Sequence, residues 1–187
     1  MKRILLFVIV FSLLASVSLF ADPSVEVQYN EPGQINLTGV VGLHLLGLSV
    51  GAGAEFIMGD LDFFPEFPME WGLAVRAVSS FYLFKSYSGF EYGAAPLATL
   101  HKGIYMDENL EFDLSLGIGL GLYGYNYTYS YSLFGTNYDT NYSEPIKIGF
   151  ASFNSISWKM KEDLWLTVEY AYVGRGSVYG VGIRKVL

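Results

Sequence analysis

The sequence predicts an all-β fold, an eight-stranded antiparallel up-and-down transmembrane β-barrel that follows an N-terminal signal peptide. From Leu110 to Leu122 every even position is Leu, Phe or Ile, and every odd position is acidic, Ser or Gly. A period of two marks a strand with unlike faces, and a strand needs about 9 to 11 residues to cross a bilayer. The mean hydropathy is +0.34, yet no run of about 18 apolar residues follows the first segment. Apolar surface without membrane helices favours a barrel.

The first segment has the features of a secretory signal peptide. Met1-Lys2-Arg3 forms a charged start, residues 4–14 are apolar, and residues 16–21 include the small side chains typical of a cleavage site. We therefore expect a signal peptide over residues 1–21 and a barrel domain over residues 22–187. An uncleaved anchor helix is the alternative, but Asp22-Pro23 directly after this segment disfavours continued helix and membrane insertion.

Composition excludes several classes of function. Two of the 11 basic residues, Lys2 and Arg3, lie in the signal segment, so nine basic residues face 18 acidic ones in the mature chain. This acidic balance excludes nucleic acid as a partner. The absence of cysteine excludes disulfides, a thiolate nucleophile and a lipid-bearing cysteine. No phosphate loop, zinc spacing or calcium loop occurs, so we expect no cofactor and no metal.

Eight strand-like segments follow the signal peptide. Their approximate limits are residues 35–45, 48–58, 69–84, 90–104, 109–123, 145–159, 164–173 and 177–187. Apolar side chains occupy alternate positions, such as Leu48, Val50, Ala52, Ala54 and Phe56 in the second segment. The opposite positions carry polar side chains, among them Ser49, Glu55, Arg76, Ser80, Thr167 and Glu169. Because each unpaired backbone group in hydrocarbon costs several kcal/mol, such strands must close on themselves.

The connections and the aromatic residues support a membrane orientation. Short charged connections at 106–109 and 160–163 and a long polar one at 124–144 place both termini on the periplasmic side, although 59–68 is long for a periplasmic turn. Aromatic residues near strand ends predict girdles at the two interfaces: Trp71, Phe84, Phe90, Tyr92, Tyr105, Trp158, Trp165 and Tyr179. A soluble β-sandwich or lipocalin-like barrel is the alternative, but it would need charged outward faces, and these faces lack charge.

Over roughly residues 33–187 the chain resembles the small eight-stranded outer-membrane barrels of the OmpA and OmpX type. The resemblance is architectural and depends on the eight alternating segments and their connections. It implies the outer membrane of a Gram-negative-type (diderm) bacterium, contact with outer-membrane lipid, and a monomer. Family members commonly end on an aromatic residue, whereas this chain ends on Leu187 after Lys185.

Alternation assigns a set of charged side chains to the lumen. An eight-stranded barrel has an interior only wide enough for side chains, so an interior charge needs a partner. We expect Arg76 and Glu169 to form a buried pair and His101 to be a polar filler. The full predicted lumen network is Arg76, Glu169, Glu55, Glu91, Glu111, Asp113, Lys147, Lys159 and Arg184. Such a network predicts a plugged lumen, and a narrow pore for small ions or solutes is the alternative.

Two weaker patterns lie near strand ends. His44 is predicted near the outer rim with Ser86 and Ser88 on a neighbouring loop, as in barrels that modify lipids, but no third orienting group is evident. Acidic residues crowd the turn from Asp60 to Glu70 and suggest at most weak cation binding. A rim-located lipid-modifying enzyme therefore remains a second alternative, and whether the chain is an enzyme stays open.

A tyrosine-rich hairpin follows the fifth segment. Its side chains are Tyr123, Tyr125, Tyr127, Tyr129, Tyr131 and, at the tip, Phe134. These tyrosines occupy odd positions, whereas the lipid-facing residues before them are even. A bulge at residues 121–124 would keep them outward, and without a bulge they would roof the lumen. We expect the hairpin to project from the membrane, where its edge can pair with an extracellular protein or another surface ligand. The predicted function is a structural or surface adhesion role.

Overall fold

The structure is a computed structural model that describes residues 29–44, 47–61, 68–84, 87–107, 110–133 and 136–187. The predicted signal peptide with its boundary at residue 21, Ser86 and Phe134 lie outside the described residues, and so does the side chain of His44. Within the described part, no helix is long and apolar enough to cross a membrane.

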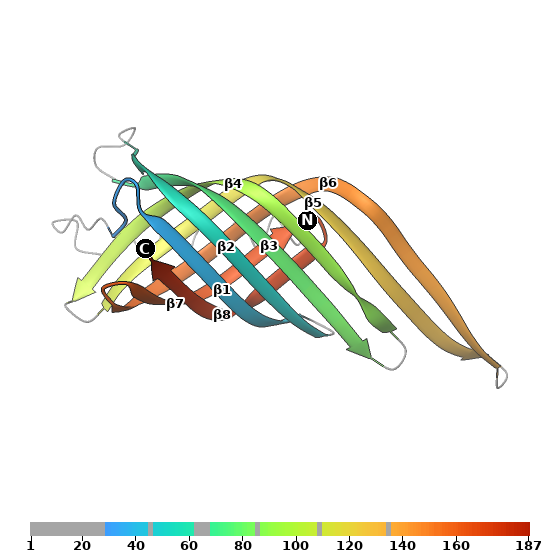
Figure 1. Cartoon of the computed structure of the whole chain (residues 1–187). Coiled ribbons are helices and arrows are strands. Elements are labelled where there is room, and N and C mark those ends of the chain that lie inside the picture. The colour runs from blue at the N-terminus through green and yellow to red at the C-terminus, as the bar shows by residue number, and fades with distance from the viewer. Residues whose placement is uncertain (1–28, 45–46, 62–67, 85–86, 108–109, 134–135) are drawn as a thin grey trace.

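Eight antiparallel strands form one closed barrel, as the sequence predicts (Figure 1). The strands are β1 (Ile35–His44), β2 (Gly47–Asp60), β3 (Glu70–Phe84), β4 (Tyr87–Asp107), β5 (Leu110–Leu133), β6 (Thr136–Lys161), β7 (Leu164–Val173) and β8 (Gly176–Val186). Each strand pairs with the next, and β8 pairs with β1 from Asn36↔Val186 to Gly42↔Gly180. Closure gives every strand of the wall a neighbour on both sides, as a barrel in hydrocarbon requires.

The two ends of the barrel differ in length and composition. We name the end where β1 begins and β8 finishes the terminal end, and the opposite end the hairpin end. At the hairpin end β5 and β6 extend well beyond the other strands (Figure 1). The connection predicted over residues 124–144 is a strand hairpin, as the tyrosine pattern predicts, because β5 continues to Leu133 and β6 starts at Thr136. The predicted strand limits at residues 123 and 145 are therefore too short. The Tyr and Thr residues of this segment favour extended backbone, and cross-strand pairs keep it in register.

The outward face of the barrel is apolar, and the inward face is largely polar. Leu43 and Ile148 are each 73% exposed on the outer wall, whereas Glu55 is only 2% exposed inside. This apolar-out, polar-in order is the reverse of a soluble barrel and is that of a transmembrane barrel. It confirms the predicted fold class.

An apolar layer crosses the middle of the interior. Its members are Val40, Ala74, Val78, Ala95, Leu97, Ala151, Phe153, Ala171, Val173 and Val178. Phe153 is fully buried and is the largest of them. A charged cluster lies near the terminal end and a smaller polar cluster near the hairpin end, so buried side chains of both kinds line the interior.

Candidate functional site

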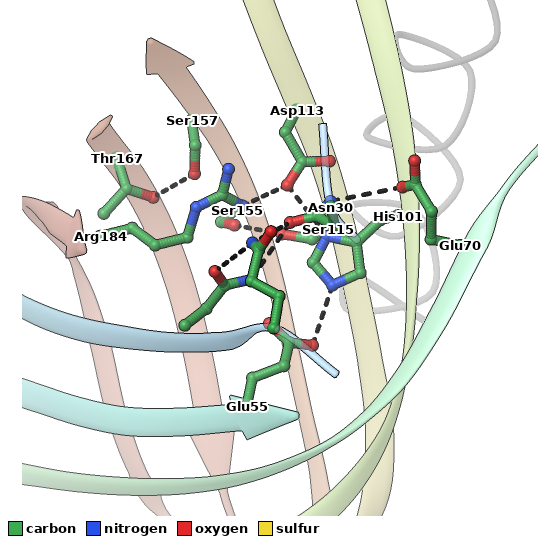
Figure 2. Close-up of polar contacts among 12 residues, drawn as sticks. Asn30, Glu55, Glu70, His101, Asp113, Ser115, Ser155, Ser157, Thr167 and Arg184 are labelled. Carbon is green, nitrogen blue, oxygen red and sulfur yellow. Dashed lines mark hydrogen bonds and ion pairs between the residues drawn. The ribbon is translucent and has the colours of Figure 1, made fainter. Parts of the chain in front are cut away.

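The terminal-end cluster consists of Glu55 on β2, His101 on β4, Asp113 on β5 and Arg184 on β8 (Figure 2). Nδ1 of His101 lies 2.9 Å from Oδ2 of Asp113, and Nε2 lies 2.9 Å from Oε1 of Glu55. Nη1 of Arg184 donates to the same Asp113 oxygen. A carboxylate against each ring nitrogen suits a doubly protonated imidazole, because both nitrogens are then donors. In this buried cluster the positive charges of two cations therefore offset the negative charges of two carboxylates.

Asn30, in the segment before β1, and Asn36, in β1, complete the cluster at the terminal end. Asn30 donates from Nδ2 to Oε2 of Glu70 at 3.3 Å, and Asn36 donates from Nδ2 to Oδ1 of Asn30 at 3.1 Å. Trp165 lies beneath Arg184, with the guanidinium carbon 4.5 Å from the ring centroid. Glu70 is therefore a buried, amide-bonded group and not part of a solvated acidic turn. Trp165 is also buried, so its predicted place in an outer aromatic girdle is wrong.

Arg76 and Glu169 lie together inside the barrel. Nη2 of Arg76 is 3.3 Å from Oε2 of Glu169, and both side chains are nearly fully buried. The guanidinium also lies over Phe153, 4.4 Å from the ring centroid, which adds a cation–π contact. Gly53 on β2 makes room for it, since a Cβ there would lie 2.0 Å from Nη1 of Arg76. The apolar layer and this pair together occupy the centre of the lumen.

A tyrosine pair holds Glu91 near the hairpin end. Tyr82 donates to Oε2 of Glu91 at 3.0 Å, and Tyr127 donates to Oε1 of the same carboxylate. The Tyr127 ring stacks with Tyr125 at a centroid distance of 4.9 Å and with Tyr87 at 5.2 Å. The interior beneath the hairpin is thus covered by aromatic rings.

The remaining predicted lumen residues lie at the margins. Lys159 and Glu111 form an ion pair at 2.6 Å that is partly exposed near the terminal end. Lys147 does not join the lumen network: its side chain is 50% exposed and pairs with Glu144. Lys147 has inward parity, but it lies so far along β6 toward the hairpin end that the barrel no longer encloses it. Lys185 of β8 donates to Asp163 in the β6–β7 turn and lowers the pKa of that carboxyl.

The structure makes two further residues central members of the cluster: His101, which was predicted to be only a polar filler, and Glu70, which was predicted to lie in an acidic turn. His101 and Glu91 both occupy odd positions of β4, and this shared parity was the sequence feature that could have placed His101 in the lumen network. Glu70 has the same parity as Arg76 on β3. Both residues lie close to strand ends, where a solvated position was the simpler expectation.

The tyrosine hairpin has two unlike faces. A register shift between Tyr123 and Tyr125 in the β5–β6 pair places Pro145 and Ile146 of β6 opposite a single residue of β5. The bulge therefore lies on β6 and not at residues 121–124 of β5. Of the two alternatives that the sequence leaves open, the structure has the one in which the tyrosines keep the inward parity. The odd tyrosines of β5 keep the inward parity and form one face with their β6 partners: Tyr125, Tyr127, Tyr129, Tyr131, Tyr138, Thr140, Tyr142 and Glu144. The other face is polar, with the residues Asn126, Thr128, Ser130, Asp139, Asn141 and Ser143.

Exposure of the tyrosine face differs between its two strands. Tyr127 of β5 is buried, whereas its partner Tyr142 on β6 is 57% exposed. Nearer the tip, Tyr131 and Tyr138 are 42% and 44% exposed and stack on each other at 5.3 Å. The face thus combines a buried ring near the barrel with an exposed aromatic surface.

One edge of the hairpin is open. β7 pairs with β6 only over residues 151–161, so residues 138–144 of β6 have β5 on one side and no paired strand of the described chain on the other. We name residues 138–144 the open edge. Leu133 pairs with Thr136 across a two-residue connection, and in such hairpins the flanking pair exchanges backbone hydrogen bonds and hydrogen-bonded pairs then alternate. The backbone N–H and C=O groups of Asp139, Asn141 and Ser143 accordingly face away from β5.

The rim arrangement with His44 and Ser86 lies outside the described residues and stays a prediction; Ser88 is in β4, paired with Leu83 of β3. No group of acidic, His or Cys side chains among the described residues is arranged to hold a metal ion.

No protein-family model matches the sequence, and no curated protein matches it. Among solved structures, the chain is similar to the crystal structure of Neisserial surface protein A (NspA), with 16% identity and a TM-score of 0.45 over 81% of this chain and 94% of that one. It is also similar to Ail, the attachment invasion locus protein of Yersinia pestis, in complex with the heparin analogue sucrose octasulfate. That match has 14% identity and a TM-score of 0.38 over 82% of this chain and 95% of that one.

The chain resembles the small eight-stranded outer-membrane barrels. At these identities the similarity concerns the fold alone.

Proposed function

We propose that this chain is a surface-exposed binding protein of a bacterial outer membrane, and that the β5–β6 hairpin is its binding element. The observation that carries the proposal is the open edge of β6, which lies beyond the closed wall of the barrel. The apolar outer wall supports the location, because outward side chains such as Leu43, Leu120 and Ile148 suit contact with lipid.

The buried side chains of the lumen support binding over transport. Glu55, His101, Asp113 and Arg184 are all buried and held to one another. Phe153 and the rest of the apolar layer lie between this cluster and Glu91. A solute would have to displace both the paired charges and the apolar layer, and each displacement is costly. The proposal therefore places the function on the outside of the barrel.

The open edge suits capture of an extended segment. Outward-facing backbone groups of Asp139, Asn141 and Ser143 offer donors and acceptors at every second residue, which is the pattern that a paired strand uses. Natural sheets usually protect such an edge with charge, proline or a bulge. Residues 138–144 contain two carboxylates, Asp139 and Glu144, but proline and the bulge come only at Pro145 and Ile146. The backbone of the open edge is therefore uninterrupted. Exposed Tyr138 and Tyr142 would add side-chain contacts on one face.

A proline substitution tests this proposal at the backbone. Asn141→Pro removes an N–H that faces away from β5, whereas Asn141→Ala keeps that N–H and removes only the side chain. The probe is a phage-displayed random peptide library, selected on vesicles that carry the full mature chain. We expect selected peptides to bind Asn141→Ala nearly as well as the unmodified chain and to lose most binding, about tenfold or more, to Asn141→Pro, because several backbone hydrogen bonds depend on an unbroken edge.

Two results would contradict the proposal that the open edge binds peptides. If no peptide is enriched over empty vesicles, or if enriched peptides bind the Asn141→Pro chain unchanged, then the open edge is not the binding element. Circular dichroism of both variants in the same vesicles checks that the barrel is intact.

A further inference from the structure

We infer that the open edge pairs with the open edge of a second copy of this chain, so that copies in facing membranes adhere to each other. The inference rests on the proposed function, because it names the partner of the same edge. It starts from the order of side chains along residues 138–144, which is compatible with antiparallel pairing of the segment with itself.

The register follows from the side chains. An antiparallel pair with a twofold axis at Thr140 places Tyr138 of each copy opposite Tyr142 of the other, on the same face of the joined sheet. It also places Asp139 opposite Asn141, twice. Aromatic pairs across strands are favourable, and a carboxylate opposite an amide avoids repulsion. A twofold axis at Asp139 would instead set two carboxylates against each other, which is unfavourable.

The backbone agrees with this register. Asp139 and Asn141 both present their N–H and C=O groups to the open side, so each Asp139–Asn141 pair can exchange two hydrogen bonds between copies. Thr140, at the axis, directs its backbone groups toward β5 and forms the non-hydrogen-bonded pair at the centre. Tyr131 already stacks on Tyr138 at 5.3 Å, so pairing would extend one tyrosine surface across both hairpins.

The direction of pairing fixes the arrangement of the two membranes. Antiparallel strands run in opposite directions, so the two barrels lie at opposite ends of the joined segment. The hairpin continues the strands of the barrel away from the wall (Figure 1). A hairpin that rises from the membrane therefore meets an inverted copy, which is one carried by a facing membrane. Each contact is short and weak, but many copies on two facing surfaces act together.

Placing a negative or a positive charge at one position, Asn141, tests both the partner and the register. Asn141→Asp sets Asp139 against a second carboxylate in both symmetric pairs, and it keeps a side-chain oxygen that can accept from Thr128, which donates to Asn141 at 2.9 Å. Asn141→Lys sets Asp139 against an ammonium in both pairs. The matched control is Asn126→Asp, because Asn126 lies on the same polar face but on β5, away from the open edge.

The measurement is energy transfer between two populations of liposomes, each carrying the full mature chain and a different lipid dye. Pairing of liposomes is expected to weaken about three- to tenfold with Asn141→Asp, to strengthen with Asn141→Lys, and to stay unchanged with Asn126→Asp, given the usual size of cross-strand charge pairs. Liposomes with protein should not pair with liposomes that lack it.

Two results would overturn the inference. One is absence of pairing between liposomes that both carry the unmodified chain. The other is an equal effect of the Asp and Lys substitutions at Asn141. If either occurs while selected peptides still distinguish Asn141→Pro from Asn141→Ala, the edge binds a different partner and the proposed function stands. If the selected peptides also do not distinguish Asn141→Pro from Asn141→Ala, both the inference and the proposed function are wrong.

Discussion

Replacing Asp113 with Ala is expected to lower the free energy of unfolding by about 3–5 kcal/mol, because removal of one member of a buried ion pair leaves its partners charged and unpaired. Asp113 accepts from both His101 and Arg184. All three side chains are almost completely buried. Urea titration of the barrel in detergent micelles, followed by tryptophan fluorescence, measures the change.

An exposed ion pair provides the control for Asp113. Asp163 pairs with Lys185 in the β6–β7 turn, and both side chains are about half exposed. Asp163→Ala should therefore leave the urea midpoint almost unchanged, since exposed pairs contribute little. Equal stability of the Asp113→Ala and Asp163→Ala chains would show that the terminal-end cluster does not hold the barrel together.

Phe153→Ala is the second substitution with a large expected effect. Phe153 is fully buried in the apolar layer and lies under the Arg76 guanidinium. Its removal should cost about 3–5 kcal/mol, since both apolar contact and cavity formation contribute. The same urea titration measures it.

Phe150→Ala is the matched control, three residues earlier on the same strand. Phe150 is 56% exposed on the outer wall. In the detergent micelle, alkyl chains replace the lost ring contacts, so the loss of stability should be clearly smaller than for Phe153→Ala. A larger loss from Phe150→Ala than from Phe153→Ala would mean that the two faces of β6 are reversed.

Much of the fold was predictable because a membrane wall imposes one simple pattern on every strand. Alternation found all eight strands, and it placed Arg76 and Glu169 on inward positions, where they lie 3.3 Å apart. The pattern works where one face meets lipid, since a one-residue slip would turn every side chain to the wrong face.

The wrong predictions concern residues beyond the membrane wall, where neither face of a strand has to meet lipid. Beyond the wall, Tyr is tolerated on either face, so parity could not decide between an outward hairpin and a roof. The extra residue lies on β6 near Pro145, not on β5, and only the pairing of both strands reveals it. The prediction that Lys147 lies in the lumen is wrong for a related reason. Parity tells which face of the strand a side chain is on, but not how far along the barrel axis the residue lies.

The charged cluster at the terminal end was only partly predictable. Sequence parity gives the inward set, but which members meet depends on the register of strands far apart in the chain. His101 on β4 meets Glu55 on β2, with β3 between them. Arg184 on β8 meets Asp113 on β5 across the lumen. Contacts across the lumen follow from closure of the barrel, which no local pattern contains.

We expect the lumen to be closed to ions and the function to lie outside it. Single-channel recording shows whether the lumen conducts. The full mature chain is reconstituted into a planar bilayer, and protease protection confirms insertion. We expect a silent membrane without unitary current steps, because a permeating ion would have to displace buried ion pairs and the apolar layer. Regular, steady openings of the unmodified chain would contradict it and make the protein a pore.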